Sequence, residues 1–338
     1  MPTRSFARGA TLAIAVFSLV GTLAACGSST PASTSDSPSA SQSGGVFPVT
    51  IKNAYGETRI EKKPERVVVL GWNDLAVASA LGAPVVGAVR YFDPANPNLP
   101  YITQKYGEDV LGLDAANVNL EKVASYNPDL ILAVTSNQLD QARYDKLSQI
   151  APTVAYPKSL YGSTMAEETE LIGKALGRTE EAAKLLADAN AKIEATKQEL
   201  PKLAGRTYLF GQARGTVLPL VVGKDNLSTK FMNSLGLKVP DAFANVQASD
   251  QLAPGTIGIS YEEAARLDSA DVLFMTFAGG QDLETFKTNP VTRELKVVKE
   301  GRYQATEISV AQLLQAPNAA GVGWLLDQLK PTLKTIGA

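Results

Sequence analysis

The side chains best suited to chemistry in this chain are aromatic residues, arginines and hydroxyl groups close to short apolar runs. They are Trp72, Arg90, Tyr91, Ser136, Tyr161, Arg214 and Phe277. Aromatic rings offer flat apolar walls to a ligand, and arginines attract anionic groups with paired donors. Loops at the carboxyl ends of parallel strands face the ligand crevice of an open α/β sheet. These residue types in these places indicate a binding site for a small molecule.

Composition and missing motifs exclude several catalytic chemistries. The chain of 338 residues contains no histidine, which removes Ser-His-Asp hydrolysis and His-ligated zinc or haem. The sequence also lacks Gly-rich phosphate loops, the G-x-S-x-G elbow and the H-E-x-x-H zinc motif. Its carboxylates are scattered, without a calcium-binding loop. We therefore expect no enzyme activity, no catalytic or metal-ligating residue and no resident cofactor.

The only cysteine, Cys26, stands at the end of a secretion signal. Arg4 and Arg8 supply a positive start, residues 10–20 form an uncharged apolar run, and Leu23-Ala24-Ala25-Cys26 ends the segment. This quartet resembles the lipobox of bacterial lipoproteins, in which the thiol is acylated and the cysteine becomes the mature N-terminus. The alternative is an ordinary signal peptide with an incidental cysteine. A transmembrane helix is disfavoured because the apolar run is shorter than the ~20 residues needed to span a bilayer.

The segment after this signal predicts a tether. Residues 27–45 are rich in serine and threonine and contain no large apolar side chain, so residues 26–45 read as an acylated cysteine with a flexible linker. Removal of residues 1–25 takes away two arginines and no acid, which changes the net charge from −2 to −4. Without a basic block, nucleic acid is not expected as a partner. We expect an extracytoplasmic monomer that is anchored to the cell membrane by its N-terminal lipid, and we expect this lipid to include palmitate.

Short apolar runs predict the strands that position the first binding side chains. Continuous apolar strands suit a parallel sheet that is covered on both faces. Strands are predicted at residues 67–70, 85–89, 130–134 and 153–156, and helices at 74–81 and 120–125. The alternation of strand and helix indicates a right-handed βαβ lobe over residues 46–162.

Two helices follow this lobe, over residues 163–204. The first covers residues 163–176 and ends at Gly177, and the second begins with Thr179 as N-cap and is stopped by Pro201. One stripe of apolar or small residues runs along the second helix: Ala182, Leu186, Ala189, Ile193, Thr196 and Leu200. About 20 residues at 1.5 Å rise extend roughly 30 Å, so a single helix could brace two lobes.

The remaining chain, residues 205–338, repeats the α/β pattern. Strands are predicted at residues 207–211 and 272–277, and helices at 227–235, 260–267 and 322–333. The predicted fold class is α/β, with two Rossmann-like lobes of mostly parallel strands joined by one long rigid helix.

Six segments, in order along the chain, resemble the iron-siderophore and cobalamin type of periplasmic substrate-binding proteins, the solute receptors of ABC importers. They are residues 64–70 (PERVVVL), 119–132 (NLEKVASYNPDLIL), 150–154 (IAPTV), 259–263 (ISYEE), 270–273 (ADVL) and 298–302 (VKEGR). The resemblance implies the periplasmic-binding fold of helical-backbone type, in a lipoprotein form. It also implies that the ligand is a ferric siderophore, which holds Fe³⁺ as a chelate. Arg90 and Arg214 would attract an anionic chelate.

The resemblance further implies a partner surface. Members of the family present one glutamate per lobe to arginine pockets on the membrane permease, and the matching positions here are Glu121 and Glu262. Both are predicted to lie in the first turn of a helix, with Glu263 as the second choice in its lobe. Acidic residues also favour helix N-termini through the macrodipole, so a purely local role is the alternative.

The sequence thus favours a lipid-anchored substrate-binding protein that captures a ferric siderophore between two lobes and delivers it to an ABC permease. A haem or cobalamin receptor of the same family is the alternative. Haem would need a tyrosine ligand or purely apolar capture, because histidine is missing. A lipoprotein enzyme on an α/β scaffold is the third reading, since the fold alone does not decide function.

Overall fold

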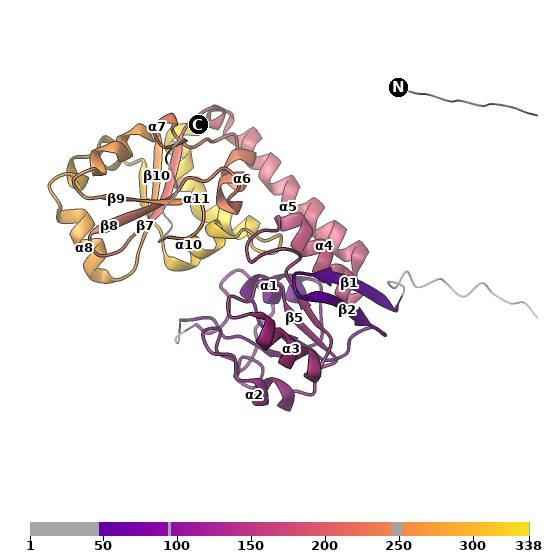
Figure 1. The fold of residues 1–338 in the computed structure, drawn as a ribbon. Coiled ribbons are helices and arrows are strands. Elements are labelled where there is room, and N and C mark those ends of the chain that lie inside the picture. Colours follow the sequence, from indigo (N-terminus) through magenta and orange to yellow (C-terminus); the bar gives the residue numbers. More distant parts are fainter. Residues whose placement is uncertain (1–46, 94–95, 245, 247–251, 338) are drawn as a thin grey trace, which may run out of the picture. The chain divides into compact units, whose positions relative to one another are not determined.

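The computed structural model describes residues 47–93, 96–244, 246 and 252–337, which belong to one compact unit (Figure 1). The predicted signal peptide, Cys26 and the predicted tether lie outside the described residues. Among the helices that the structure describes, none is both long and apolar enough to cross a bilayer.

A four-stranded parallel sheet forms the centre of the first lobe, in the order β4-β3-β5-β6. Its strands are β3 (Val67–Val69), β4 (Val85–Ala88), β5 (Leu130–Ala133) and β6 (Thr153–Ala155). Each of these strands lies within one predicted strand. Continuous apolar runs are the right signal here, because the sheet is covered on both faces and apolar residues need not alternate with polar ones. An antiparallel hairpin of β1 (Val49–Asn53) and β2 (Gly56–Ile60) precedes the sheet. This hairpin was not predicted.

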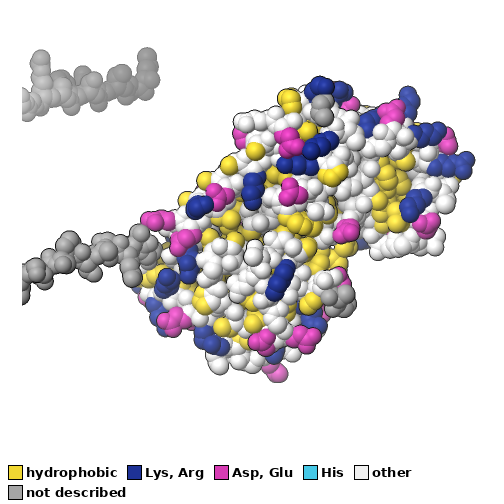
Figure 2. Space-filling view, turned by 180° about the vertical axis from the view of Figure 1, so that it is seen from behind, with side chains coloured by type: hydrophobic (Ala, Val, Ile, Leu, Met, Phe, Trp, Pro, Cys, Tyr) yellow, Lys and Arg dark blue, Asp and Glu magenta, His cyan; other side chains and the backbone are white. Residues whose placement is uncertain are grey.

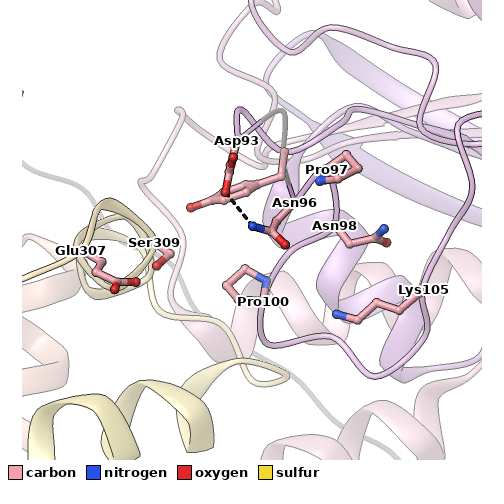
Figure 3. A pocket seen from close by; sticks show the side chains of 9 residues that line it. Asp93, Asn96, Pro97, Asn98, Pro100, Lys105, Glu307 and Ser309 are labelled. Carbon is pink, nitrogen blue, oxygen red and sulfur yellow. Dashed lines mark hydrogen bonds between the residues drawn. The ribbon is translucent and has the colours of Figure 1, made fainter.

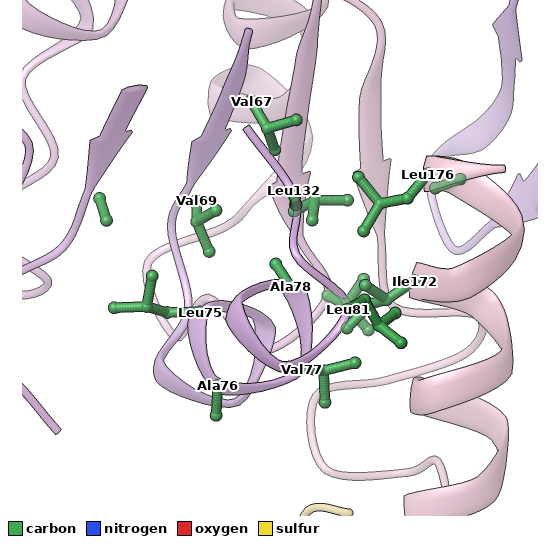
Figure 4. Close-up of a cluster of buried hydrophobic side chains, with 14 of the residues drawn as sticks. Val67, Val69, Leu75, Ala76, Val77, Ala78, Leu81, Leu132, Ile172 and Leu176 are labelled. Atoms are coloured by element: carbon green, nitrogen blue, oxygen red, sulfur yellow. The ribbon is translucent and has the colours of Figure 1, made fainter. Parts of the chain in front are cut away.

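Three helices connect the strands of this sheet. They are α1 (Trp72–Ala80), α2 (Leu120–Ser125) and α3 (Gln141–Ile150). Helix α1 begins two residues before its predicted start, at Trp72. Its N-cap, Gly71, approaches the end of β5 so closely that a Cβ there would collide with Thr135. Val69 of the sheet and Leu75 of α1 share a buried core with Ile172 (Figure 4).

Helices α4 (Met165–Leu176) and α5 (Thr179–Glu199) pack against each other. Gly177 ends α4 with a left-handed φ of 64°, as the sequence predicts. The prediction that Thr179 is the N-cap of α5 is wrong, because Thr179 is already helical and Arg178 is the cap.

The predicted stripe of α5 is buried along its whole length. Ala182, near its start, belongs to the core of the first lobe. From Leu186 onward the stripe belongs to the core of the second lobe, together with Phe210. Helix α5 therefore contributes to both cores, although the boundaries predicted for the lobes stay predictions.

The second lobe contains a five-stranded mixed sheet in the order β11-β10-β7-β8-β9. Its strands are β7 (Tyr208–Ala213), β8 (Val217–Val221), β9 (Thr256–Ser260), β10 (Val272–Phe277) and β11 (Tyr303–Ala305). Strands β7, β10 and β11 run parallel, whereas β8 is antiparallel to both β7 and β9. The parallel prediction thus holds for three of the five strands.

The predicted helix over residues 260–267 is wrong. Ser260 ends β9, and a turn leads into a 3₁₀ helix over Ala264–Ser269. Ala264 and Leu267, three positions apart, are buried. A spacing of three suits the three-residue turn of a 3₁₀ helix better than an α-helix.

Helices cover both faces of the second sheet. They are α6 (Leu227–Ser234), α7 (Asp241–Ala244), α8 (Gly280–Thr288), α9 (Lys296–Lys299), α10 (Ile308–Gln315) and α11 (Val322–Gly337). Short 3₁₀ helices occur at Pro201–Leu203 and Thr292–Glu294. Phe274 of β10 packs in the core that contains residues of α6, α10 and α11, and its neighbour Met275 packs in the core on the opposite face. This alternation determines which side chains of β10 reach the site.

Candidate functional site

Two pockets flank α10, and one of them is lined by both lobes. The first, here named the interlobe pocket, has a volume of about 340 Å³. Its walls come from the start of α10 and from one stretch of the first lobe (Figure 3). They are Glu307 and Ser309, together with Tyr91, Asp93, Asn96, Pro97, Asn98, Pro100 and Lys105. The second, here named the α10 pocket, has a volume of about 390 Å³ and is lined by β7, β8, β10 and the other side of α10.

Three aromatic rings gather beside the interlobe pocket. Trp72 contacts the rings of Tyr91 and Phe92 edge to face, with centroid distances of 5.7 and 5.8 Å. The Trp72 indole N–H donates to the carbonyl oxygen of Arg90 at 3.1 Å, which holds the ring at the start of α1. Phe92 is 40% exposed, so the group presents an apolar surface to solvent. Phe92 was not singled out from the sequence, although it directly follows Tyr91.

The Tyr91 hydroxyl is buried without a hydrogen-bond partner among the described residues. The Ser309 hydroxyl, across the interlobe pocket, lies near it without hydrogen-bond geometry. Burial raises the pKa of Tyr91 above its usual range, the charge of an ionised Tyr101 adds to the rise, and the carboxylates of Asp93 and Glu307 add smaller contributions, whereas the Ser309 hydroxyl lowers it. The hydroxyl therefore stays protonated and can donate one hydrogen bond to a ligand.

The carboxyl ends of β7 and β10 supply the α10 pocket. Arg214 is exposed, directly after β7, and lines this pocket together with Gln212 and Thr276. Phe277 lines neither pocket, because the alternation of β10 turns its ring to the opposite face of the sheet. There it packs against Phe286 with the ring centroids 5.6 Å apart.

The other nominated side chains lie apart from the two pockets. Arg90 is exposed and lines neither of them. Ser136 is buried just after β5, and its backbone N–H donates to the carbonyl oxygen of Ala133. Tyr161 is 45% exposed and has a left-handed φ of 58°. The structure therefore places Tyr91 and Arg214 in the linings of these pockets. Trp72 contacts the Tyr91 ring without lining a pocket, and the other four nominated residues also lie outside both linings.

A buried polar network joins the lobes beneath these pockets. The Asn73 side chain donates to Glu168 at 3.3 Å and to the carbonyl oxygen of Ala316 at 3.1 Å. Asn318 donates in turn to the Asn73 side chain at 2.9 Å. Glu168 belongs to α4, whereas Ala316 and Asn318 lie between α10 and α11. Four residues thus connect the first lobe to the end of the pocket helix α10, and we name this network the interlobe latch.

Two buried carboxyl groups, Glu168 of the interlobe latch and Asp74 beside Asn73 in the chain, have raised pKa values. Glu168 is 3% exposed, and burial, followed by the charge of Asp74, raises its pKa to about 8. Burial also raises the pKa of Asp74 to about 6, although hydrogen bonds from the Thr135 hydroxyl and N–H favour its ionised form. The sequence alone did not single out these two acids, because only the fold buries them close together.

The two nominated glutamates are exposed, in different local settings. Glu121 lies in the first turn of α2, as predicted, where Asn119 caps the helix. The same prediction for Glu262 is wrong, because that residue lies in the turn between β9 and the 3₁₀ helix. Its neighbour Glu263 is engaged locally, since it accepts from the Ser260 N–H and pairs with Arg266.

Charged side chains on the face shown in Figure 2 are mixed in sign. Lysines and arginines alternate there with aspartates and glutamates, and no broad basic patch is formed. Nucleic-acid binding depends on such a patch, so this face is unsuited to it.

Comparison with known proteins now adds to this geometry. The family described as periplasmic binding protein matches residues 67–306. The chain belongs to this family. The iron(3+)-hydroxamate-binding protein FhuD of Bacillus subtilis is 32% identical over 290 residues, which cover 84% of this chain and 85% of that protein. YhfQ of B. subtilis, named as an ABC transporter substrate-binding lipoprotein, is 25% identical and covers 87% of this chain and 91% of its own length.

The periplasmic binding protein fold is also seen in solved relatives. The crystal structure of Staphylococcus aureus SirA complexed with staphyloferrin B matches with a TM-score of 0.69 and 25% identity, over 85% of this chain and 98% of that one. The predicted family and fold class are thereby confirmed. Because these relatives are substrate-binding proteins, the prediction that this chain is not an enzyme is confirmed as well.

Proposed function

We propose that this periplasmic binding protein captures a ferric siderophore between its lobes and delivers it to an ABC permease. The observation that carries the proposal is the meeting of both lobes around α10. Tyr91 of the aromatic group lines one pocket there and Arg214 lines a second, and both pockets include residues of α10. Aromatic walls suit a bulky chelate with an apolar outer surface, and the arginine suits an acceptor-rich one. The ligands named for the relatives support the same class of substrate.

The proposal includes a lipid anchor at Cys26. A diacylglycerol group supplies two acyl chains, which is the number needed for stable membrane attachment. The lipobox supports this anchor, and the lipoprotein name of a full-length relative agrees with it. The protein would then work outside the cytoplasm, close to its permease.

Direct titration tests ligand capture. The fragment 44–338 corresponds to the compact unit and can be titrated with ferrichrome, ferric citrate, cobalamin and haemin while tryptophan fluorescence is recorded. We expect quenching by a ferric siderophore, because the Trp72 ring contacts Tyr91, which lines the interlobe pocket. The variant W324F should keep the signal and W72F should lose most of it. If only cobalamin or haemin bound, that compound would replace the siderophore as the ligand. Catalytic turnover of any probe, in place of stoichiometric binding, would favour an enzyme.

Permease docking through Glu121 and Glu262 is a separate part of the proposal. Both side chains are exposed on different lobes, and no hydrogen bond or ion pair engages Glu262 among the described residues. Truncating one partner of a buried charged pair costs about 2–5 kcal/mol, and charge reversal adds repulsion.

Uptake assays with charge-reversal variants test this docking surface. E121R and E262R should sharply reduce uptake of the ferric siderophore while its affinity in solution stays unchanged. D145R and E284R are matched controls, because they reverse exposed acids elsewhere on the same two lobes. Loss of affinity in E121R or E262R would assign these residues to ligand binding instead.

A further inference from the structure

The interlobe pocket carries more negative than positive charge. Asp93 and Glu307 face it from different lobes, and Lys105 is the third charged residue of its lining (Figure 3). The Lys105 ammonium donates to the carbonyl oxygen of Leu99 at 3.3 Å and lies on the side of the pocket away from Glu307 (Figure 3). The lining near Glu307 is therefore acidic.

A buried hydroxyl lies within reach of this acidic side. Tyr91 is 5% exposed, its hydroxyl has no partner among the described residues, and it lies near Ser309. Both carboxylates act on it, because Asp93 and Glu307 each help to raise its pKa. A buried hydroxyl without a partner is unfavourable, so a ligand group that bonds to it would be bound more tightly.

We propose that the interlobe pocket receives a cationic, hydrogen-bond-donating arm of the chelate, such as a primary ammonium group. The pocket then prefers ferric chelates of neutral or positive net charge over polyanionic ones. Asp93 and Glu307 supply the attraction, and the hydroxyl oxygens of Tyr91 and Ser309 accept hydrogen bonds from the ammonium. This inference rests on the proposed function and names its substrate class.

The proposal changes what the arginines imply about the ligand. Arg90 lines neither pocket, and Arg214 lines only the α10 pocket, whose lining does not include Glu307. The site is thus polarised, with its positive end at the α10 pocket and its negative end at the interlobe pocket. A ligand that fits it presents acceptor oxygens to Arg214 and a donor arm to Glu307.

A matched pair of probes tests the proposal on the fragment 44–338. Ferrioxamine B is a ferric tris-hydroxamate with a terminal ammonium group, and its N-acetyl derivative lacks only that charge. We expect the acetylated probe to bind about tenfold more weakly, as for loss of one charged hydrogen bond. The preference should shrink at high salt, since part of it is an attraction between exposed charges.

Variants then assign the preference to the pocket. E307Q should reduce the tenfold difference to about twofold, and Y91F should weaken both probes without reversing their order. E284Q, an exposed acid on α8, should leave the difference unchanged.

Three outcomes would count against the proposal in distinguishable ways. Equal affinity for the two probes, or tighter binding of ferric citrate than of ferrioxamine B, would overturn this inference and leave siderophore capture standing. Binding of neither probe nor of any other ferric chelate would overturn the proposed function itself. An unchanged preference in E307Q would move the ammonium site away from this pocket.

Discussion

Replacing Glu168 by glutamine should remove a pH-dependent loss of stability. Burial raises the pKa of this carboxyl from 4.5 to about 8, with a further contribution from the charge of Asp74. A carboxyl with a raised pKa binds its proton more tightly in the folded chain. The stability that results is fully present below pH 4.5 and is lost as the pH rises through about 8.

The expected size follows from linkage. At pH 7 the carboxyl is ionised in the unfolded chain and still mostly protonated in the folded one. Over the roughly 2.5 pH units above 4.5, the free energy of unfolding therefore falls by about 3 kcal/mol. Glutamine keeps a side-chain oxygen that can accept from Asn73 and has no charge to lose. E168Q should thus gain about 3 kcal/mol over the wild type between pH 4.5 and pH 7.

Urea unfolding of the fragment 44–338 at several pH values measures this difference. E170Q is the matched control, because Glu170 is exposed on the same helix. Asp74, with a pKa of about 6, adds its own pH dependence to the wild type and to E170Q alike, and its charge also raises the pKa of Glu168. Parallel pH profiles for the wild type and E168Q would refute the reasoning, since Glu168 would then ionise in the folded protein without a penalty from burial.

Three further outcomes are expected. C26S should move the protein from the membrane to the soluble fraction, because no other thiol can accept a lipid; a mutant that stays membrane-bound would indicate an uncleaved helix. R214A should weaken siderophore binding by about 1.5–3 kcal/mol in a fluorescence titration, whereas R90A should have little effect. A larger loss in R90A than in R214A would place the ligand beside Arg90 instead. G177A should cost more in urea unfolding than the roughly 1–2 kcal/mol of its left-handed φ of 64°, because a Cβ there would also collide with the Phe47 ring. G301A, at φ 69° in open space, measures the backbone part alone.

Much of the fold could be predicted because it depends on local patterns. The run at residues 67–70, the buried stripe of α5 and the stop at Gly177 each follow from the period or conformation of a few neighbouring residues. Errors occurred where local signals conflict. The segment after Ser260 has apolar residues three positions apart, a spacing that α-helices and 3₁₀ helices share. Thr179 is followed by two acids, which suit the first turn of a helix whether Thr179 is the N-cap or the first helical residue.

The candidate site could be predicted only in part. The sequence could predict Trp72, Tyr91 and Arg214, because the carboxyl ends of parallel strands face the crevice of an α/β sheet. Phe277 was misplaced because a rule about strand ends does not say which face a side chain takes. That depends on the register of β10 against β7, which turns Thr276 toward the pocket and Phe277 away from it.

By itself, the sequence determined the classes of chemistry that are open to this protein, the family and most of the elements. Only the tertiary structure decided which distant groups meet. Asn73 and Asn318 are 245 positions apart, and their contact in the interlobe latch requires both lobes to be packed against α4 and α5. The same packing brings Tyr91 toward Ser309 and buries Glu168, and burial is what shifts its pKa. Local periodicity cannot encode such contacts, because they arise from the way complete helices and sheets pack together.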